Sequence, residues 1–495
     1  MTRLFTESEW DFAALDRVYK AIEEVAVGEM GLDVYPNQIE VISSEQMLDA
    51  YSSLAMPLMY NHWSFGKLFA REEAMYRGGY SALAYEIVIN SSPCISYLLE
   101  ENTMTMQALV IAHAAFGHNH FFRNNYLFRQ WTNAEGILDY LAFAKAYIAA
   151  CEERHGRDEV EAILDSAHAL MDQGVFRYRR PPRPSKERTR EKLLARAKYE
   201  EEAYSELWRT LPAGIEPPAA PTPDPDEDDF GAMKLPEENL LYFLEKNSPA
   251  LKPWQRETLR IVRNLAQYFY PQKQTKVMNE GCATFVHHAI MNRLYDKGLI
   301  SEGSLLEFLH SHTSVVFQPD YDDRRYSGLN PYALGFAMMT DIKRVCEAPT
   351  AEDREWFPHI AGNGDAMGTL RDAWANYRDE SFIEQFLSPK AIRDLRLFAL
   401  ADKAADPVYR VSGIHNDQGY RRVRANLARQ YDIGLCDPNI QVVRADLRGD
   451  RRLVLEHRQH RGVPLHERTK ETVLAHVERL WGHDVSLREI ADDAA

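Results

Sequence analysis

Long apolar segments are absent from this sequence of 495 residues. No apolar run approaches the ~20 residues that a helix needs to cross a bilayer, so we expect no membrane-spanning segment. The N-terminus also lacks the basic stretch and the following apolar stretch of a secretory signal. Both absences predict a cytoplasmic protein.

Cysteine is scarce, with five scattered residues and no C-x-x-C pair. This argues against a disulfide framework and against a cysteine-based zinc site, and it fits a reducing compartment. Phosphate-binding glycine loops are missing as well, since neither G-x-x-x-x-G-K-[ST] nor G-x-G-x-x-G occurs. The sequence therefore predicts no nucleotide-binding loop.

Positive charge is in deficit, because 58 Lys and Arg residues stand against 74 Asp and Glu residues, a formal net charge of −16. A net acidic chain attracts nucleic acid poorly, so we expect no nucleic-acid partner. Residues 420–470 carry a local excess of basic side chains but almost no aromatic rings on which bases could stack. We interpret this segment as a solvated charged face, with phosphate or an acidic partner as the alternative.

The composition is that of a globular protein, with 45% hydrophobic and 27% charged residues. Most of the chain shows helical periodicity, whereas residues 84–90 have the β-branched enrichment of a strand, which Pro93 ends. The sequence therefore predicts an α+β fold that is predominantly α-helical. It has a helical core domain with a short edge strand, and a small C-terminal α+β module.

Breaks in composition divide the chain into four segments. They are an N-terminal helical part of the core at 1–180, a Pro-rich charged linker or excursion at 181–234, a second helical part of the core at 235–404, and the α+β module at 405–495. Proline density and like charge prevent burial of the linker. In the module we expect strands at 440–445 and 453–457 and a helix at about 467–480.

Histidines are concentrated in the segment His113-Ala-Ala-Phe-Gly117-His118-Asn-His120. On a regular helix His113 and His120 nearly eclipse, whereas His113 and His118 lie roughly 140° apart. The second pair converges only if Gly117 breaks or bulges the turn, which a residue without a side chain permits. Both pairings stay open on spacing alone.

A second cluster pairs Glu280 with His287, which share one face of a predicted helix. The small residues Gly281, Ala283 and Thr284 lie between them and allow another helix to approach. Two helices that each offer paired ligands across small residues are what a metal site in a helix bundle requires. Imidazoles with one carboxylate suit zinc, and more carboxylates would suit iron or manganese.

Other candidates carry weaker signals. Glu86 on the predicted strand is a candidate base beside a metal-bound water, or a solvent-facing carboxylate. Glu135 and Asp139 are a possible further ligand or support. We expect His312 in a loop with a structural role, and Cys282 as a packed thiol, because a nearby carboxylate opposes thiolate formation.

The alternative to a metal site is chance spacing. Pairs of His and Glu at helical spacing are common, and most are solvated or hydrogen-bonded in a core. The sequence contains no H-E-x-x-H motif, and Ala114 stands where a zincin keeps its general base. On this interpretation the histidines are structural.

Motifs along nearly the whole chain outside the linker resemble those of the stage V sporulation protein R (SpoVR) family. They are Tyr35–Glu40, Met59–Lys67, Tyr85–Asn90, His113–Asn119, Thr275–Gly281 with His287, Asn330–Gly335, Asp379–Ile383 and Leu387–Pro389. In spore formers, this family is associated with the spore cortex and hence with peptidoglycan. In other bacteria its gene often accompanies a serine protein kinase of the PrkA type and a von Willebrand A-like protein, which implies a stress response.

The family pattern carries over at His113, Gly117, His118, Glu280 and His287. It favours the first two histidines of the histidine segment over the last one. The block around Glu280 is also similar to the third-ligand helix of glutamate-type zinc peptidases.

Two hypotheses follow. In the first, the protein is a metal-dependent, zincin-like hydrolase of an amide or peptide bond, in which His113, His118, Glu280 and His287 supply the metal ligands. Glu86 or Glu280 takes the proton from the activated water, and strand 84–90 aligns an extended substrate. In the second, the protein is a non-enzymatic regulator or scaffold that works with the kinase and the von Willebrand A-like partner.

Overall fold

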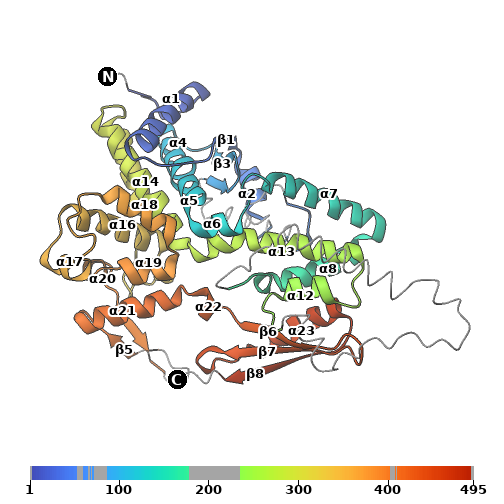
Figure 1. Ribbon diagram of the computed structural model, residues 1–495. Coiled ribbons are helices and arrows are strands. Elements are labelled where there is room, and N and C mark those ends of the chain that lie inside the picture. The colour runs from blue at the N-terminus through green and yellow to red at the C-terminus, as the bar shows by residue number, and fades with distance from the viewer. Residues whose placement is uncertain are drawn as a thin grey trace, which may run out of the picture. The chain divides into compact units, whose positions relative to one another are not determined.

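The protein is described by a computed structural model (Figure 1), which covers residues 3–52, 59–64, 67, 70–71, 86–177, 235–401, 407–408 and 410–491. Its contacts divide the chain into two units: residues 1–172 with 252–437, and residues 173–251 with 438–495. Within these residues helices dominate and the strands form three small sheets, which confirms the predicted α+β, mainly helical fold. The predicted linker lies outside the described residues.

The first unit is built almost entirely from helices, with two small sheets. In chain order its elements are α1 (Phe12–Glu23), η1 (Glu24–Glu29), β1 (Asn37–Ile42), α2 (Ser44–Ser52), β2 (Glu86–Ile89), β3 (Cys94–Leu99), α4 (Met104–Ile111), η2 (Ala112–His118), α5 (Asn119–Asn124), α6 (Tyr126–Trp131), α7 (Ile137–His155), α8 (Arg157–Ala169), α13 (Pro253–Gln274), α14 (Lys276–Asp296), α15 (Glu302–Val315), α16 (Pro331–Glu347), α17 (Ala351–Trp356), α18 (Ala366–Asn376), α19 (Asp379–Phe386), α20 (Pro389–Asp394), β4 (Ala399–Ala401), β5 (Arg410–Gly413), α21 (Asp417–Gln430) and α22 (Ile433–Cys436). Among the described helices, none is long and apolar enough to cross a membrane.

Helix α14 is the centre of this unit. It is buried on nearly every side and packs against η2, α15 and α16, and Figure 1 shows α14, α16 and α18 side by side. Its first turn is held by Asp379, whose carboxylate accepts hydrogen bonds from the backbone N–H groups of Val277 and Met278, both at 2.8 Å. Thr275 is the N-cap residue, but its hydroxyl donates to the carbonyl of Pro271 and not to α14.

Glycines allow three helices to meet at close range. A Cβ on Gly117 would lie 2.5 Å from the Cα of Ala283, and a Cβ on Gly281 would lie 2.6 Å from the Cα of Gly335. Real Cβ atoms do not approach backbone so closely, so only glycine fits at these two contacts. The close helix approach expected from the small residues of this segment is therefore confirmed, with η2 on one side of α14 and α16 on the other.

A three-stranded sheet in the order β1-β3-β2 lies beside η2. The central strand β3 is fully buried, and it pairs parallel to β1 and antiparallel to β2. The strand predicted at 84–90 is present as β2, while its first two positions lie outside the described residues. Glu86 is the first residue of β2, which places its side chain at the end of the sheet that meets η2.

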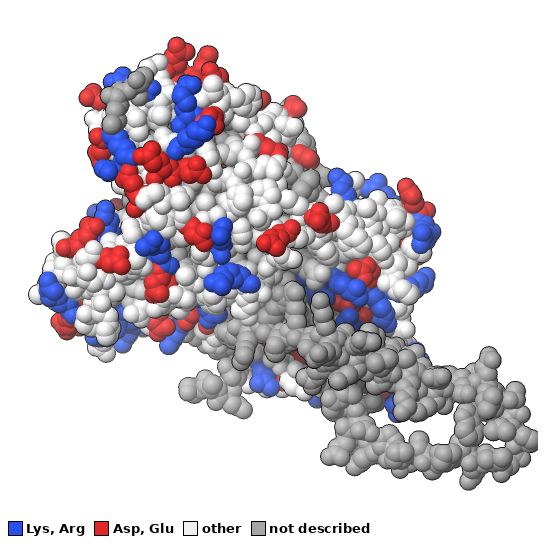
Figure 2. Space-filling view, turned by 45° about the horizontal axis from the view of Figure 1, so that its top comes forward, with Lys and Arg blue, Asp and Glu red and all other residues white. Residues whose placement is uncertain are grey.

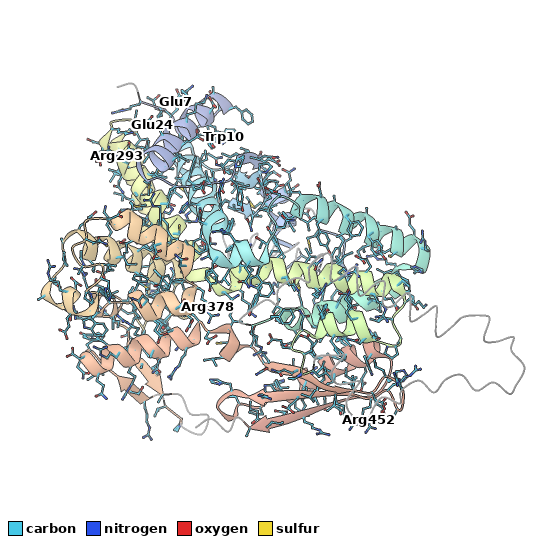
Figure 3. All side chains as sticks on the ribbon, viewed as in Figure 1. Glu7, Trp10, Glu24, Arg293, Arg378 and Arg452 are labelled. Atoms are coloured by element: carbon cyan, nitrogen blue, oxygen red, sulfur yellow. The ribbon has the colours of Figure 1, made fainter. Side chains whose placement is uncertain are left out.

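The far end of α14 is held by exposed ion pairs. Arg293 contacts Glu29 at 2.6 Å, and Lys297 contacts Glu29 at 2.6 Å and Glu24 at 3.2 Å. Figure 3 labels Glu24 and Arg293 at this end of the helix.

The face of the molecule shown in Figure 2 carries acidic and basic side chains that are interspersed rather than segregated. Exposed pairs of this kind contribute little individually, so the position of α14 depends mainly on its packing.

In its described residues, the second unit contains a three-stranded sheet in the order β6-β7-β8 and two α-helices. Its elements are α12 (Leu240–Asn247), β6 (Asn439–Ala445), β7 (Leu453–Gln459), α23 (Glu467–Trp481) and β8 (Val485–Ala491). The two strands and the helix predicted near the C-terminus are present, and β8, which was not predicted, pairs parallel to β7.

The beginning of the predicted C-terminal module belongs to the first unit. Helix α21 packs against α19 and buries Tyr420, Val423 and Ala428 in the core of that unit. The structure therefore begins the second unit's C-terminal part after Asp437 rather than at residue 405.

Candidate metal centre

The histidine segment contains a π-helical turn. Residues 112–118 form η2, and the rings of His113 and His118 lie 4.6 Å apart between centroids, at 85° to each other. A π-helical turn holds more residues than an α-helical turn, so residues five apart come onto the same side. The structure therefore brings together the pair that requires a bulged turn at Gly117.

His120 points elsewhere. Its Nδ1 atom lies at hydrogen-bond distance from the backbone N and O atoms of Asp33, at 3.0 and 2.9 Å. Its ring packs edge-on against Trp374, with centroids 5.5 Å apart. The pairing of His113 with His120 that an ideal helix suggested is not formed.

Two carboxylates complete the cluster with His113 and His118. One oxygen of Glu280 lies 3.5 Å from Nε2 of His118 and 3.9 Å from Nε2 of His113, and an oxygen of Glu86 lies 3.6 Å from Nε2 of His113. Ligand atoms of Glu86, His113 and His118 lie within 4.8 Å of one another. In the part of the chain that the structure describes, this is the one group of three or more possible ligands that converges in this way.

The other ring nitrogens of the two histidines are held by neighbouring side chains. Nδ1 of His118 lies 2.9 Å from the amide oxygen of Asn279, and Nδ1 of His113 lies 2.8 Å from Nδ1 of His287. An amide oxygen only accepts, so Nδ1 of His118 carries a proton, and its Nε2 atom faces Glu280. In metal-binding histidines, one ring nitrogen faces the metal and the other is hydrogen-bonded to a supporting partner. His113 and His118 show this arrangement.

His287, predicted as a ligand, contacts the histidine His113 rather than the carboxylates of the cluster. Its Nδ1 contacts His113 and its Nε2 lies 2.9 Å from Nδ1 of His312. Both of its nitrogens are therefore engaged with other histidines. His312 lies on α15, not in the expected loop, and it is buried. The sequence reasoning missed its contact with His287, because nothing in the spacing links residues on two different helices.

Two further supporting residues were missed. Asn279 directly precedes the predicted ligand Glu280, and this position could have indicated that Asn279 supports the metal centre. The ring of Tyr332 in the first turn of α16 stacks near His113, with centroids 6.5 Å apart. It belongs to the motif Asn330–Gly335, for which the sequence predicted no role. Glu135 and Asp139, considered as further ligands, are exposed and take no part in the cluster.

Burial sets the protonation of the centre. It raises the pKa of Glu86 to about 8, with repulsion from Glu280 as a second cause. It lowers the pKa of His113 and of His287 well below the usual value, and the neighbouring histidines add to this effect. Burial also raises the pKa of Cys282, as expected for a packed thiol. His113 and His287 are thus neutral imidazoles, and they lie near closely spaced carboxyl groups.

One atom tests whether these residues fit a cation. Oε2 of Glu280 is buried and, among the described residues, has no hydrogen-bond partner. Leaving a buried acceptor unsatisfied costs about 1–3 kcal/mol, and more for a charged group. A cation between this oxygen and the two Nε2 atoms would remove that cost, so the donor set fits a metal ion.

Comparison with known proteins identifies the family. The sequence matches the family model "SpoVR like protein" over residues 9–436 and "SpoVR-like C-terminal domain" over residues 438–492. The chain therefore belongs to the SpoVR family.

A curated relative matches the chain over its whole length. The chain is 55% identical over 496 residues to "Uncharacterized protein YcgB" of Escherichia coli (strain K12), which covers 100% of this chain and 95% of that protein. No solved structure matches the chain.

Proposed function

We propose that the first unit binds one divalent metal ion, with zinc as the first candidate, through His113, His118 and Glu280. The supporting observation is the unpartnered oxygen of Glu280 beside two Nε2 atoms. Two imidazoles and one glutamate are a known ligand set of catalytic zinc sites. In this arrangement Glu280 is a ligand rather than the base, and His287 orients His113.

The proposed activity is hydrolysis of an amide or peptide bond. A bound divalent ion would polarise the scissile carbonyl and acidify a water molecule. Glu86 takes the proton that the water loses as the new C–O bond forms, and it delivers this proton to the nitrogen as the C–N bond breaks. Burial raises the pKa of the Glu86 carboxyl in the metal-free protein, and a bound cation would lower it again, toward the range in which a carboxyl group both accepts and donates a proton near neutral pH.

The position of Glu86 on an edge strand bears on the substrate. Within the described residues β2 pairs with β3 on one side only, and an extended peptide can pair with such an edge. We propose an extended peptide substrate. The family's link to the spore cortex favours a peptidoglycan-related peptide, and a cytoplasmic location would make it a precursor or, in a stress response, a protein.

Elemental analysis of freshly purified protein tests the metal centre. We expect about one metal ion per chain, as in a single-ion catalytic site. A His113→Ala/Glu280→Ala variant should lose it. A matched control is Glu302→Ala/His310→Ala, which removes an exposed glutamate and an exposed histidine of α15 outside the cluster. A native protein that carries no metal and takes up none from added zinc, iron or manganese would refute the proposal.

The second candidate is a scaffold role with the PrkA-type kinase and the von Willebrand A-like protein. The observation that favours it is the separate second unit, which has its own family match and exposed arginines such as Arg444 and Arg448. An Arg444→Glu/Arg448→Glu variant should lose co-purification with the kinase, while Arg129→Glu on α6 should keep it. Unchanged binding in the double variant would exclude this face as the docking site.

A further inference from the structure

A pocket of about 350 Å³ lies in the first unit, and its lining does not include the histidine cluster. One wall is the loop between α15 and α16, from Gln318 to Leu329. The other wall runs from Asp394, the last residue of α20, to Leu400. None of its lining residues belongs to the proposed metal centre, and its volume is in the range of small-molecule sites.

Three aromatic rings meet at this pocket. The ring of Tyr321 lies 5.3 Å from that of Tyr326, at 64°, and 5.3 Å from that of Phe398, at 74°. Tyr321 is 45% exposed and Tyr326 is 36% exposed. Both tyrosines line the pocket and leave part of their ring surface uncovered, and the faces of such rings carry the negative part of the ring quadrupole.

The charged side chains of the lining are mostly acidic. Asp320, Asp322 and Asp394 stand against a single basic residue, Arg396. Arg396 contacts Asp320 at 2.7 Å, but both side chains are exposed, so the pair is weak. Asp394 contacts Lys390 one turn back on α20. Asp322 has no ion-pair partner among the residues that the structure describes, so the pocket keeps an excess of negative charge.

The pocket walls are held in place before any ligand arrives. The side chain of Gln318 accepts a hydrogen bond from the backbone of Asn330 at 2.7 Å and donates to the carbonyl of Gly328 at 3.3 Å. Arg396 has a φ of 52°, and this left-handed residue turns the chain sharply after α20. A preformed pocket binds its ligand with a smaller ordering cost.

We propose that this pocket binds an organic cation, namely a primary ammonium or guanidinium group on an apolar stem. Unpaired carboxylate charge and uncovered aromatic faces both attract such a cation, while Leu329 and Leu400 offer apolar surface to the stem. The same charge excess disfavours phosphates and carboxylates. A free polyamine and a basic side chain of a protein share this chemistry.

Titration calorimetry with two molecules of matched length tests the charge requirement. We expect 1,6-diaminohexane to bind and 1,6-hexanediol, which has the same stem without the charge, not to bind. Spermidine and N-acetyl-lysine amide then distinguish the sources: tighter spermidine binding indicates a free polyamine, and tighter lysine binding indicates a protein side chain. Equal binding of diamine and diol, or no binding of any amine, would overturn the proposal.

Variants locate the binding at this pocket. Tyr321→Leu removes a ring face but keeps an apolar side chain, and Asp322→Asn removes the unpaired charge. Each should weaken diamine binding by about fivefold, the loss expected for one cation–π or ionic contact at a partly exposed site. Asp16→Asn, an equal change of charge on α1, is the control and should bind as the native protein does. Unchanged affinity in both pocket variants, shown by circular dichroism to be folded, would refute the site.

Discussion

At the scale of single residues, the cluster depends on which nitrogen of each histidine faces the carboxylates. If Nε2 of His113 binds a cation, its Nδ1 carries the proton and donates to His287, which must then donate from Nε2 to His312. Three histidines on η2, α14 and α15 thus share one consistent set of protons. A substitution of the supporting residue His312 therefore tests the metal centre, as a substitution of a ligand does.

Replacing His312 by leucine should weaken metal binding without removing a ligand. His287 would lose its acceptor and hold His113 less firmly, and loss of such a supporting partner lowers metal affinity by about 10–100-fold. Competition with a chromophoric chelator measures this change. His310→Leu alters an exposed residue of the same helix and should leave affinity unchanged. Equal metal affinities of the two variants would show that the contacts among His113, His287 and His312 have only a structural role.

The raised pKa of Glu86 makes the stability of the metal-free protein depend on pH. Its pKa is about 8 in the folded protein and near 4.5 when unfolded, so between these values the folded state holds a proton that the unfolded state does not. The free energy of unfolding therefore falls as pH rises, by up to about 1.4 kcal/mol per pH unit from this group.

Urea unfolding of the native protein and of Glu86→Gln at pH 6.5 and at pH 8 checks this dependence. The difference between the two proteins isolates Glu86, because Asp379, whose pKa burial raises to about 7, and the buried histidines, whose pKa values burial lowers, contribute to both. From pH 6.5 to pH 8 the native protein should lose more stability, or gain less, than Glu86→Gln. An identical slope in the native protein and in Glu86→Gln would contradict the proposed environment of Glu86.

At the scale of elements, the centre requires close contact between η2 and α14. Gly117→Ala would place a Cβ 2.5 Å from the Cα of Ala283, and the helices would have to separate. Such overpacking typically costs about 1–3 kcal/mol of stability, and it would also pull the histidines of η2 away from Glu280. We expect a lower midpoint of urea unfolding together with weaker metal binding.

Gly28→Ala is the matched control for that change. Gly28 lies in the helical turn η1, and a Cβ there meets nothing within 4 Å. Alanine favours a helix over glycine, so this variant should be as stable as the native protein or more stable. If both alanine variants kept full stability and metal content, the close approach of η2 to α14 would not be essential.

The elements also show what the sequence could predict. Local patterns were sufficient for strand β2 and for the close approach around Gly281, because each depends on neighbouring residues. Spacing alone left the partner of His113 open between His118 and His120, and only the family resemblance favoured His118. The contact of His312 with His287 and the capping of α14 by Asp379 were not predictable, because each joins residues of separate helices. Strand β8 was not predicted, because its charged residues interrupt the alternation of apolar and polar residues that is typical of a strand.

At the scale of the whole molecule, the candidate ligands and the base come from β2, η2 and α14, which are distant in sequence but belong to one unit. A cation that binds the folded first unit alone stabilises that unit by mass action. The gain is about 4 kcal/mol when free metal exceeds its dissociation constant by a thousandfold. The second unit contains none of these residues, so metal should leave it unchanged.

Hydrogen exchange of the full chain, with and without zinc, measures both units in one experiment. Amides of η2 and α14 should exchange more slowly in zinc, because opening these helices requires release of the ion. Amides of β7, in the second unit, should exchange at the same rate in both conditions. The His113→Ala/Glu280→Ala variant should show no difference anywhere. Slower exchange in β7 as well would mean that zinc acts outside the cluster, and unchanged exchange in α14 would mean that the cluster does not hold zinc.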